Sequence, residues 1–138
     1  MFESSADALV NAVNTVGVMG AGIALEFKKR YPKNFSEYKT ACDKKEFKTG
    51  SILMVNENDG KTIINFPTKK HWVNDSNYEY IKSGLRALKK ELEKGSIKSI
   101  ALPPLGCELK GLKWPKVKKL IKRELGSLEI IINVYEPQ

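Results

Sequence analysis

The chain has 138 residues, of which 41% are hydrophobic. This size and composition predict one globular domain, residues 1–138. No segment approaches the roughly 20 apolar residues that cross a bilayer. The single histidine and the two cysteines, Cys42 and Cys107, lack the spacing of zinc ligands. The sequence therefore argues against a metal site, a bound cofactor and a Ser-His or Cys-His nucleophile.

The charge balance favours an anionic partner. Lysine and arginine outnumber the acids 24 to 16, which gives a formal charge of +8. Such an excess suits nucleotides, nucleic acid or acidic protein segments, although a solvated lysine-rich surface explains it equally well. The two cysteines are too few for a disulfide framework, and the first residues do not resemble a signal peptide. We therefore expect a cytoplasmic protein.

The first half of the chain predicts one strand, then two helices, then two further strands. Residues 8–13 form an apolar run typical of a buried parallel strand, and a glycine loop follows at 17–22. Apolar residues at every fourth position then predict a helix that Pro32 ends, and a second helix is expected over 34–46. The expected strands 52–55 and 62–66 are joined through Asn58-Asp59-Gly60, a hairpin signal.

The second half continues the alternation of helices and strands. Ser76 and Glu79 have the spacing of a capping box, which predicts a helix from Ser76 to about Gly95. Residues 97–102 predict another buried strand, 114–125 a helix with proline in its first turn, and 128–135 a last strand. Strands alternating with helices predict three α/β/α layers, and the hairpin makes the central sheet mixed.

Two glycine-bearing loops each follow a buried strand and lead towards a helix. Open α/β sheets bind ligands beyond the carboxyl ends of their strands, where helix N-termini present unpaired amides to phosphate. The loops at 17–22 and 103–111 could therefore hold a diphosphate from two sides, or they could be no more than tight turns. The usual dinucleotide and Walker fingerprints are absent.

Three segments resemble the macrodomain family. Asn11-Ala12-Val13-Asn14, followed by Gly17 to Ala24, resembles the ADP-ribose-binding opening of macrodomains, and Pro103 to Leu109 is similar to their second phosphate loop. Phe66 to Trp72 resembles the branch that contains the DNA ADP-ribosyl glycohydrolase antitoxin DarG and the terminal ADP-ribose protein glycohydrolase.

The resemblance implies an ADP-ribosyl glycohydrolase with Lys69 as its catalytic residue. A deprotonated lysine can attack the anomeric carbon of a ribose. The substrate would be an ADP-ribosylated macromolecule, either DNA or protein, and the basic surface could contact nucleic acid. The implied ADP-ribose-binding residues are Asn14, Met19, Gly20, Ala21, Gly22, Ile23, Thr68, Leu105, Gly106, Cys107, Glu108, Leu109 and Tyr135.

Some positions depart from the family pattern. Macrodomains usually begin with another strand, whose aspartate recognises adenine, and the sequence starts after that point, so we expect this strand to be missing. Lys110 occupies the position of an aspartate in the eukaryotic relative, and Val73 stands where DarG-like sequences often have arginine. Trp114 fits a core position, whereas Trp72 could stack a nucleobase or close a core.

Two alternatives stay open at this point. The chain could be a reader that binds ADP-ribose without cleaving it, or a general anion or RNA binder that acts through its lysine-rich surface.

Overall fold

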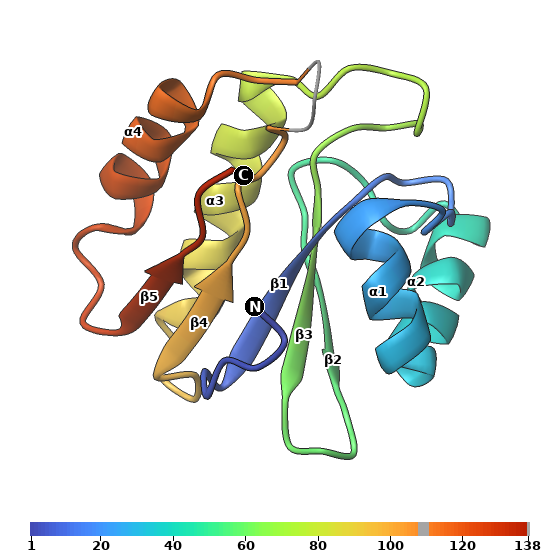
Figure 1. Ribbon diagram of the computed structural model, residues 1–138, viewed down its shortest axis with the longest axis horizontal. Helices are drawn as coiled ribbons and strands as arrows, with labels where there is room; N and C mark the ends of the chain where they lie inside the picture. Colours follow the sequence, from blue (N-terminus) through green and yellow to red (C-terminus); the bar gives the residue numbers. More distant parts are fainter. Residues whose placement is uncertain (108–110, 138) are drawn as a thin grey trace.

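The computed structural model describes residues 1–107 and 111–137. Helices α1 and α2 cover one face of a five-stranded sheet and helices α3 and α4 cover the other (Figure 1). The prediction of three α/β/α layers is confirmed. The elements in chain order are β1 (Ala8–Val13), α1 (Gly22–Arg30), α2 (Pro32–Asp43), β2 (Leu53–Asn56), β3 (Thr62–Pro67), α3 (Tyr78–Leu92), β4 (Ser99–Leu102), α4 (Trp114–Leu125) and β5 (Ile131–Val134).

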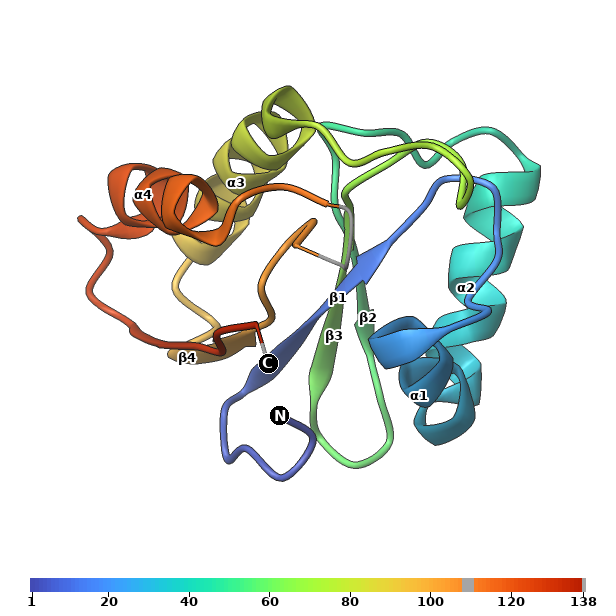
Figure 2. The same cartoon turned by 45° about the horizontal axis from the view of Figure 1, so that its top comes forward.

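The sheet is mixed and has the strand order β2-β3-β1-β4-β5. Strand β1 lies in the middle and pairs in parallel with β3 and β4, and β4 pairs in parallel with β5. Strand β2 is antiparallel to β3, as the hairpin signal predicts. Because β1, β3 and β4 run the same way, the loops at their carboxyl ends meet at one end of the sheet (Figures 1 and 2).

Each face of the sheet has its own apolar core. Phe66 and Leu85 are fully buried on the α3 and α4 side, and Phe27 and Leu9 are fully buried on the α1 and α2 side. Each such side chain stabilises the fold by about 1.5–3 kcal/mol. None of the helices within residues 1–107 and 111–137 is both long and apolar enough to cross a membrane.

The start of α3 corrects the capping-box prediction. Asn77, not Ser76, is the N-cap: its side-chain oxygen accepts hydrogen bonds from the Glu79 amide at 2.8 Å and the Tyr80 amide at 3.3 Å. Asparagine and serine are about equally good N-caps, so a spacing rule built on serine places the start one residue too early. Ser76 is buried instead, with 6% of its surface exposed.

Two further boundaries differ from the expectation. Helix α2 begins at Pro32 rather than Asn34 because the first turn of a helix needs no amide donor and tolerates proline. Strand β5 begins at Ile131 rather than Leu128, whose amide donates to the Leu125 carbonyl in a turn after α4. Leu128 nevertheless packs against the α3 and α4 core, which explains its apolar character.

Candidate functional site

A cleft of about 620 Å³ opens at the carboxyl ends of β1 and β3, beside the N-terminus of α1. Strand ends, a glycine loop and the first turn of a helix thus converge on one hollow. The residues that line it are Ala12, Val13, Asn14, Val18, Gly20, Ala21, Gly22, Ile23, Ala24, Thr68, Lys69 and Trp72.

Among the described residues, the N-terminus of α1 has no capping side chain and no acid in its first turn where it borders this cleft. The N-cap residue is Ala21, which has no side chain to accept a hydrogen bond, and the first turn contains no acidic residue. The unpaired amides and the partial positive charge of the helix are therefore left to a ligand, and an anion suits both. Gly22 has a φ of +56°, and a side chain built on it would meet nothing within 4 Å, so the backbone is open to close approach.

The Asn14 side chain shapes the loop that precedes α1. Its oxygen lies 3.1 Å from the Val16 amide, 3.4 Å from the Val18 amide and 2.7 Å from the Tyr38 hydroxyl, and all three donate to it. Its nitrogen donates to the Val18 carbonyl at 2.8 Å. This fits the local backbone bonding typical of asparagine after a strand. Asn14 thus lines the cleft but is used mainly to hold the loop in shape.

Burial keeps Tyr38 in the form that can donate to this network. Its side chain is fully buried beneath the loop. Loss of solvent around the phenol raises the pKa of Tyr38 far above its usual value, because the charged form is not solvated there. The hydroxyl therefore remains protonated and remains a donor at any physiological pH.

Thr68 and Lys69 are attached to the same loop through the backbone. The Thr68 amide donates to the Val13 carbonyl at 2.9 Å, which extends the pairing of β1 with β3. The Thr15 amide and hydroxyl both donate to the Lys70 carbonyl, at 3.1 and 2.9 Å. Thr68 is buried, whereas Lys69 is half-buried at the wall of the cleft. The segment that carries Lys69 is therefore held against the glycine loop.

Other residues implied by the resemblance do not line the cleft. Met19 is buried in the α1 and α2 core, where the Asn11 side chain donates to its sulfur at 3.8 Å. Leu105 is fully buried, and Tyr135 follows β5, its amide donating to the Leu102 carbonyl at 2.9 Å. Met19 and Leu105 thus belong to the two apolar cores, whereas the Tyr135 side chain is exposed.

The second glycine loop lies at the same end of the sheet as the first. It follows β4 and leads into α4, and Gly106 has a φ of +71°. A side chain on Gly106 would meet Leu112 and Ser76, each at 3.1 Å, so this glycine permits close packing. Cys107 is half-buried, and its amide donates to the Pro104 carbonyl at 3.0 Å. Glu108, Leu109 and Lys110 lie outside the described residues.

The cleft also contains residues that the sequence reasoning missed or left open. Ala12, Val13, Val18 and Ala24 line it, and the position of the first two at the end of a buried strand was the available signal. Trp72 lines it as well, with 57% of its surface exposed. Trp114, in contrast, is half-buried against the core, as expected. No group of three or more potential metal ligands occurs within the described part of the chain.

Comparison with known families agrees with this geometry. The model of the family described as Macro domain matches residues 10–121. The chain belongs to the macro domain family. The match includes most of β1, the first glycine loop, the Lys69 segment and most of α4.

Individual relatives of this macro domain bear names that refer to ADP-ribose. A DNA ADP-ribosyl glycohydrolase of Thermus aquaticus is 44% identical over 99% of the chain, which spans 39% of that relative. The solved macrodomain of T. aquaticus DarG superposes with a TM-score of 0.93. The superposition covers 99% of this chain and 93% of the DarG macrodomain. The structure of Thermosipho africanus DarTG in complex with ADP-ribose is 39% identical, with a TM-score of 0.92, and the chain covers 39% of it. The human ADP-ribose glycohydrolase OARD1 is 30% identical over 94% of the chain, which spans 81% of it.

Proposed function

We propose that this macro domain binds ADP-ribose and acts as a glycohydrolase that releases ADP-ribose from a modified macromolecule, with DNA as the modified molecule. The observation that carries the proposal is the juxtaposition of Lys69 and the uncapped N-terminus of α1 in one cleft. Relatives named DNA ADP-ribosyl glycohydrolase support the same reaction.

The diphosphate would lie at the N-terminus of α1. Gly20, Ala21, Gly22 and Ile23 line the cleft there, and Gly22 allows close approach of an oxygen to the backbone. Asn14 would act by fixing this loop, while one of its two amide hydrogens stays available for a ribose hydroxyl. We keep Gly106, Cys107, Glu108, Leu109 and Tyr135 as candidates for the other side of the ligand.

Lys69 would carry the chemistry at the anomeric carbon of the distal ribose. The neutral amine attacks that carbon and forms a C–N bond, while the electrons of the glycosidic bond leave with the target, which takes a proton. The resulting N-glycoside opens its ribose ring to a C=N imine, and water hydrolyses that imine back to the lysine amine, so the products are free ADP-ribose and the unmodified target. Thr68 would position Lys69, because the Thr68 amide donates a hydrogen bond to the Val13 carbonyl and so fixes the preceding backbone.

The decisive experiment compares wild type with Lys69→Ala and Lys69→Arg on an ADP-ribosylated oligonucleotide. We expect wild type to release ADP-ribose and both variants to lose at least a hundredfold in rate, because neither alanine nor an always-charged arginine can act as the nucleophile. Calorimetry with free ADP-ribose should give affinities within a few fold of wild type. Reduction with borohydride during turnover should attach ADP-ribose to wild type only.

Two results would replace this proposal. If wild type binds ADP-ribose but releases none from DNA or protein, the chain is a reader. If Lys69→Arg keeps full activity, the lysine acts as a charge rather than as a nucleophile. Lys70→Ala is the matched control, since it removes the neighbouring exposed cation and should leave the rate unchanged.

We also propose that the protein acts in the cytoplasm. The chain has only two cysteines, too few for a disulfide framework, which fits a reducing compartment.

A further inference from the structure

The positive charge of the chain is concentrated on α4. Residues 113–125 contain six basic side chains and one acid, Glu124, and so carry a net charge of +5 of the chain's +8. The basic residues are Lys113, Lys116, Lys118, Lys119, Lys122 and Arg123. If the lysines served only to keep the surface solvated, the positive charge would be spread evenly over the chain. The concentration of charge on α4 therefore needs a separate explanation.

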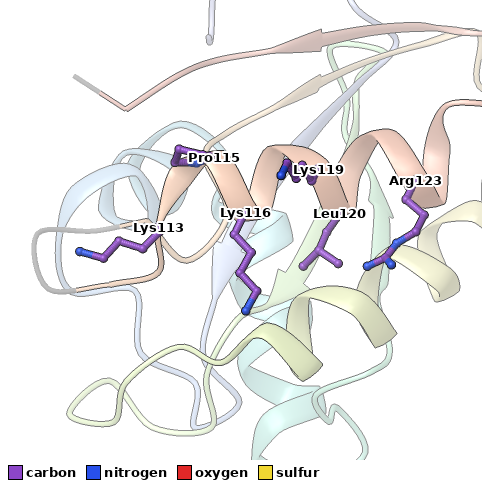
Figure 3. A pocket seen from close by; sticks show the side chains of 6 residues that line it. All are labelled: Lys113, Pro115, Lys116, Lys119, Leu120 and Arg123. Carbon is purple, nitrogen blue, oxygen red and sulfur yellow. The ribbon is translucent and has the colours of Figure 1, made fainter.

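Four of these cations border one open groove of about 660 Å³ along α4. Figure 3 shows the four cations spaced along α4, with Lys116 and Arg123 extending in the same direction on either side of Leu120. Spacings of three or four residues place side chains on one face of a helix. We call this set the α4 basic stripe: Lys113, Lys116, Lys119 and Arg123.

The α4 basic stripe has no carboxylate partners within the described residues. Ion pairs near α4 use other groups: Arg86 with Glu124 at 3.3 Å and Lys118 with Glu136 at 3.7 Å. Lys116 lies instead over the Tyr78 ring, 4.3 Å from its centroid, which leaves its charge uncompensated. Four like charges on one face repel each other, and an anion that spans them relieves the repulsion.

The groove suits a phosphate backbone better than a protein or a membrane. The apolar face of α4 is already used, because Val117, Leu120, Ile121 and Leu125 are buried in the core. No apolar face therefore remains to enter a bilayer. The large exposed apolar side chains of the described chain all lie elsewhere, whereas protein interfaces need an apolar centre.

The stripe begins at the end of the sheet where the cleft opens. The Lys113 amide donates to the Tyr78 hydroxyl at 2.9 Å, which anchors the start of α4 beside the start of α3. Helix α4 follows the loop after β4, at the same end of the sheet as the carboxyl ends of β1 and β3 (Figures 1 and 2). From Lys113 to Arg123 the stripe extends about 15 Å at 1.5 Å per residue. That length matches roughly four phosphates at about 3.4 Å per nucleotide.

We propose that the α4 basic stripe binds the phosphate backbone of the DNA strand that carries the modified nucleotide, while the cleft holds the ADP-ribose. This inference rests on the proposed function for its substrate. Contacts to phosphates position a strand without reading its sequence. The stripe would therefore raise the affinity for a long substrate and leave the chemistry at the cleft unchanged.

The test uses the full chain with Lys113, Lys116, Lys119 and Arg123 all changed to glutamine. The matched control changes Lys29, Lys44, Lys45 and Lys48 to glutamine, which removes the same charge from exposed positions on or beside α1 and α2, the opposite face of the sheet. Binding of an unmodified, fluorescent 20-nucleotide single strand is measured by anisotropy between 50 and 200 mM salt. Release of ADP-ribose is measured on an ADP-ribosylated 20-mer and on an ADP-ribosylated mononucleotide.

We expect the stripe variant to lose about 3 from the slope of log affinity against log salt, since each phosphate contact on a single strand contributes about 0.7. Wild type should then lose roughly 50-fold more affinity than the stripe variant across this fourfold change in salt. KM for the 20-mer should rise in the stripe variant, with turnover of the mononucleotide unchanged.

Equal slopes for the stripe variant and the control variant would overturn the proposal, because binding would then follow overall charge. Equal affinity for poly-glutamate of the same charge would also overturn it in favour of acidic protein. Because the strand is unmodified, this readout is independent of the cleft. Failure of the proposed function would instead appear as no release from either substrate with DNA binding intact.

Discussion

The hydrogen bond between Tyr38 and Asn14 connects the core beneath α2 with the loop that forms the wall of the cleft. The Tyr38 ring is fully buried, and its hydroxyl lies 2.7 Å from the Asn14 side-chain oxygen. Tyr38→Phe removes only the hydroxyl and keeps the ring in place. Asn14→Ala removes the side-chain acceptor together with the two amide contacts and the bond to the Val18 carbonyl, but leaves the Asn14 main-chain carbonyl 3.0 Å from the hydroxyl.

The structure gives different magnitudes for the two changes. After Tyr38→Phe, the Asn14 oxygen still accepts from two backbone amides, so only one net hydrogen bond is lost, about 0.5–1.5 kcal/mol. That corresponds to a fall in Tm of roughly 1–12 °C for a domain of this size range. Asn14→Ala leaves several loop groups without partners and should lower the free energy of unfolding by about 2–3 kcal/mol. ADP-ribose affinity should fall in both variants, by about fivefold for Tyr38→Phe if 1 kcal/mol of loop order is lost.

Urea denaturation of wild type, both single variants and the double variant forms a double-mutant cycle. Residues in direct contact should show a coupling energy of at least about 0.5 kcal/mol. Additivity within about 0.3 kcal/mol would refute the reasoning, because the hydroxyl would then not act through the Asn14 side chain. Unchanged ADP-ribose affinity in Asn14→Ala would separately show that the shape of the loop does not govern binding.

Two further predictions concern the glycine loop and alkaline pH. Gly22→Ala should lower ADP-ribose affinity at least about tenfold in calorimetry. Gly60→Ala is the control, because Gly60 also has free space and a positive φ but lies in the β2–β3 hairpin. Both variants should lose about 1 kcal/mol of stability, but only Gly22→Ala should lose affinity for ADP-ribose. Burial and then the hydrogen bond with Asp59 raise the pKa of Tyr31 from 10.0 to about 12. The unfolded chain therefore ionises first above pH 10, so stability falls between about pH 10 and 12, and Tyr31→Phe should flatten that fall in urea denaturation across the range. Parallel pH curves for wild type and Tyr31→Phe would contradict this assignment.

Much of the fold is encoded locally and could be predicted. The apolar run at 8–13 and the 3.6-residue pattern of 114–125 match β1 and α4 as the structure has them. The prediction failed where two local signals competed: Ser76 and Asn77 are both good N-caps, and tertiary packing buries Ser76. Leu128 and Ile130 look like part of a strand because they are apolar at alternate positions, although they pack against the core from bends before β5.

The candidate site likewise contains residues that the sequence predicts and residues whose role only the structure shows. Motif order indicated Asn14, the Gly20–Gly22 loop, Thr68 and Lys69, and all of them line one cleft. No local pattern distinguishes Met19, which faces the core, from Val18, which lines the cleft. The role of Asn14 as an acceptor for Tyr38 was equally hidden, because the two residues are 24 positions apart.

The sequence by itself determined the alternation of strands and helices, the positions of the glycine loops and the excess of positive charge, because these depend on residue type and short-range spacing. Only the tertiary structure decided which groups meet. Parallel pairing of β1 with β3 brings Lys69 to the glycine loop, and the docking of α4 on α3 leaves four cations along one open groove. These contacts depend on strand order and helix packing, which bring together residues that are far apart in the chain.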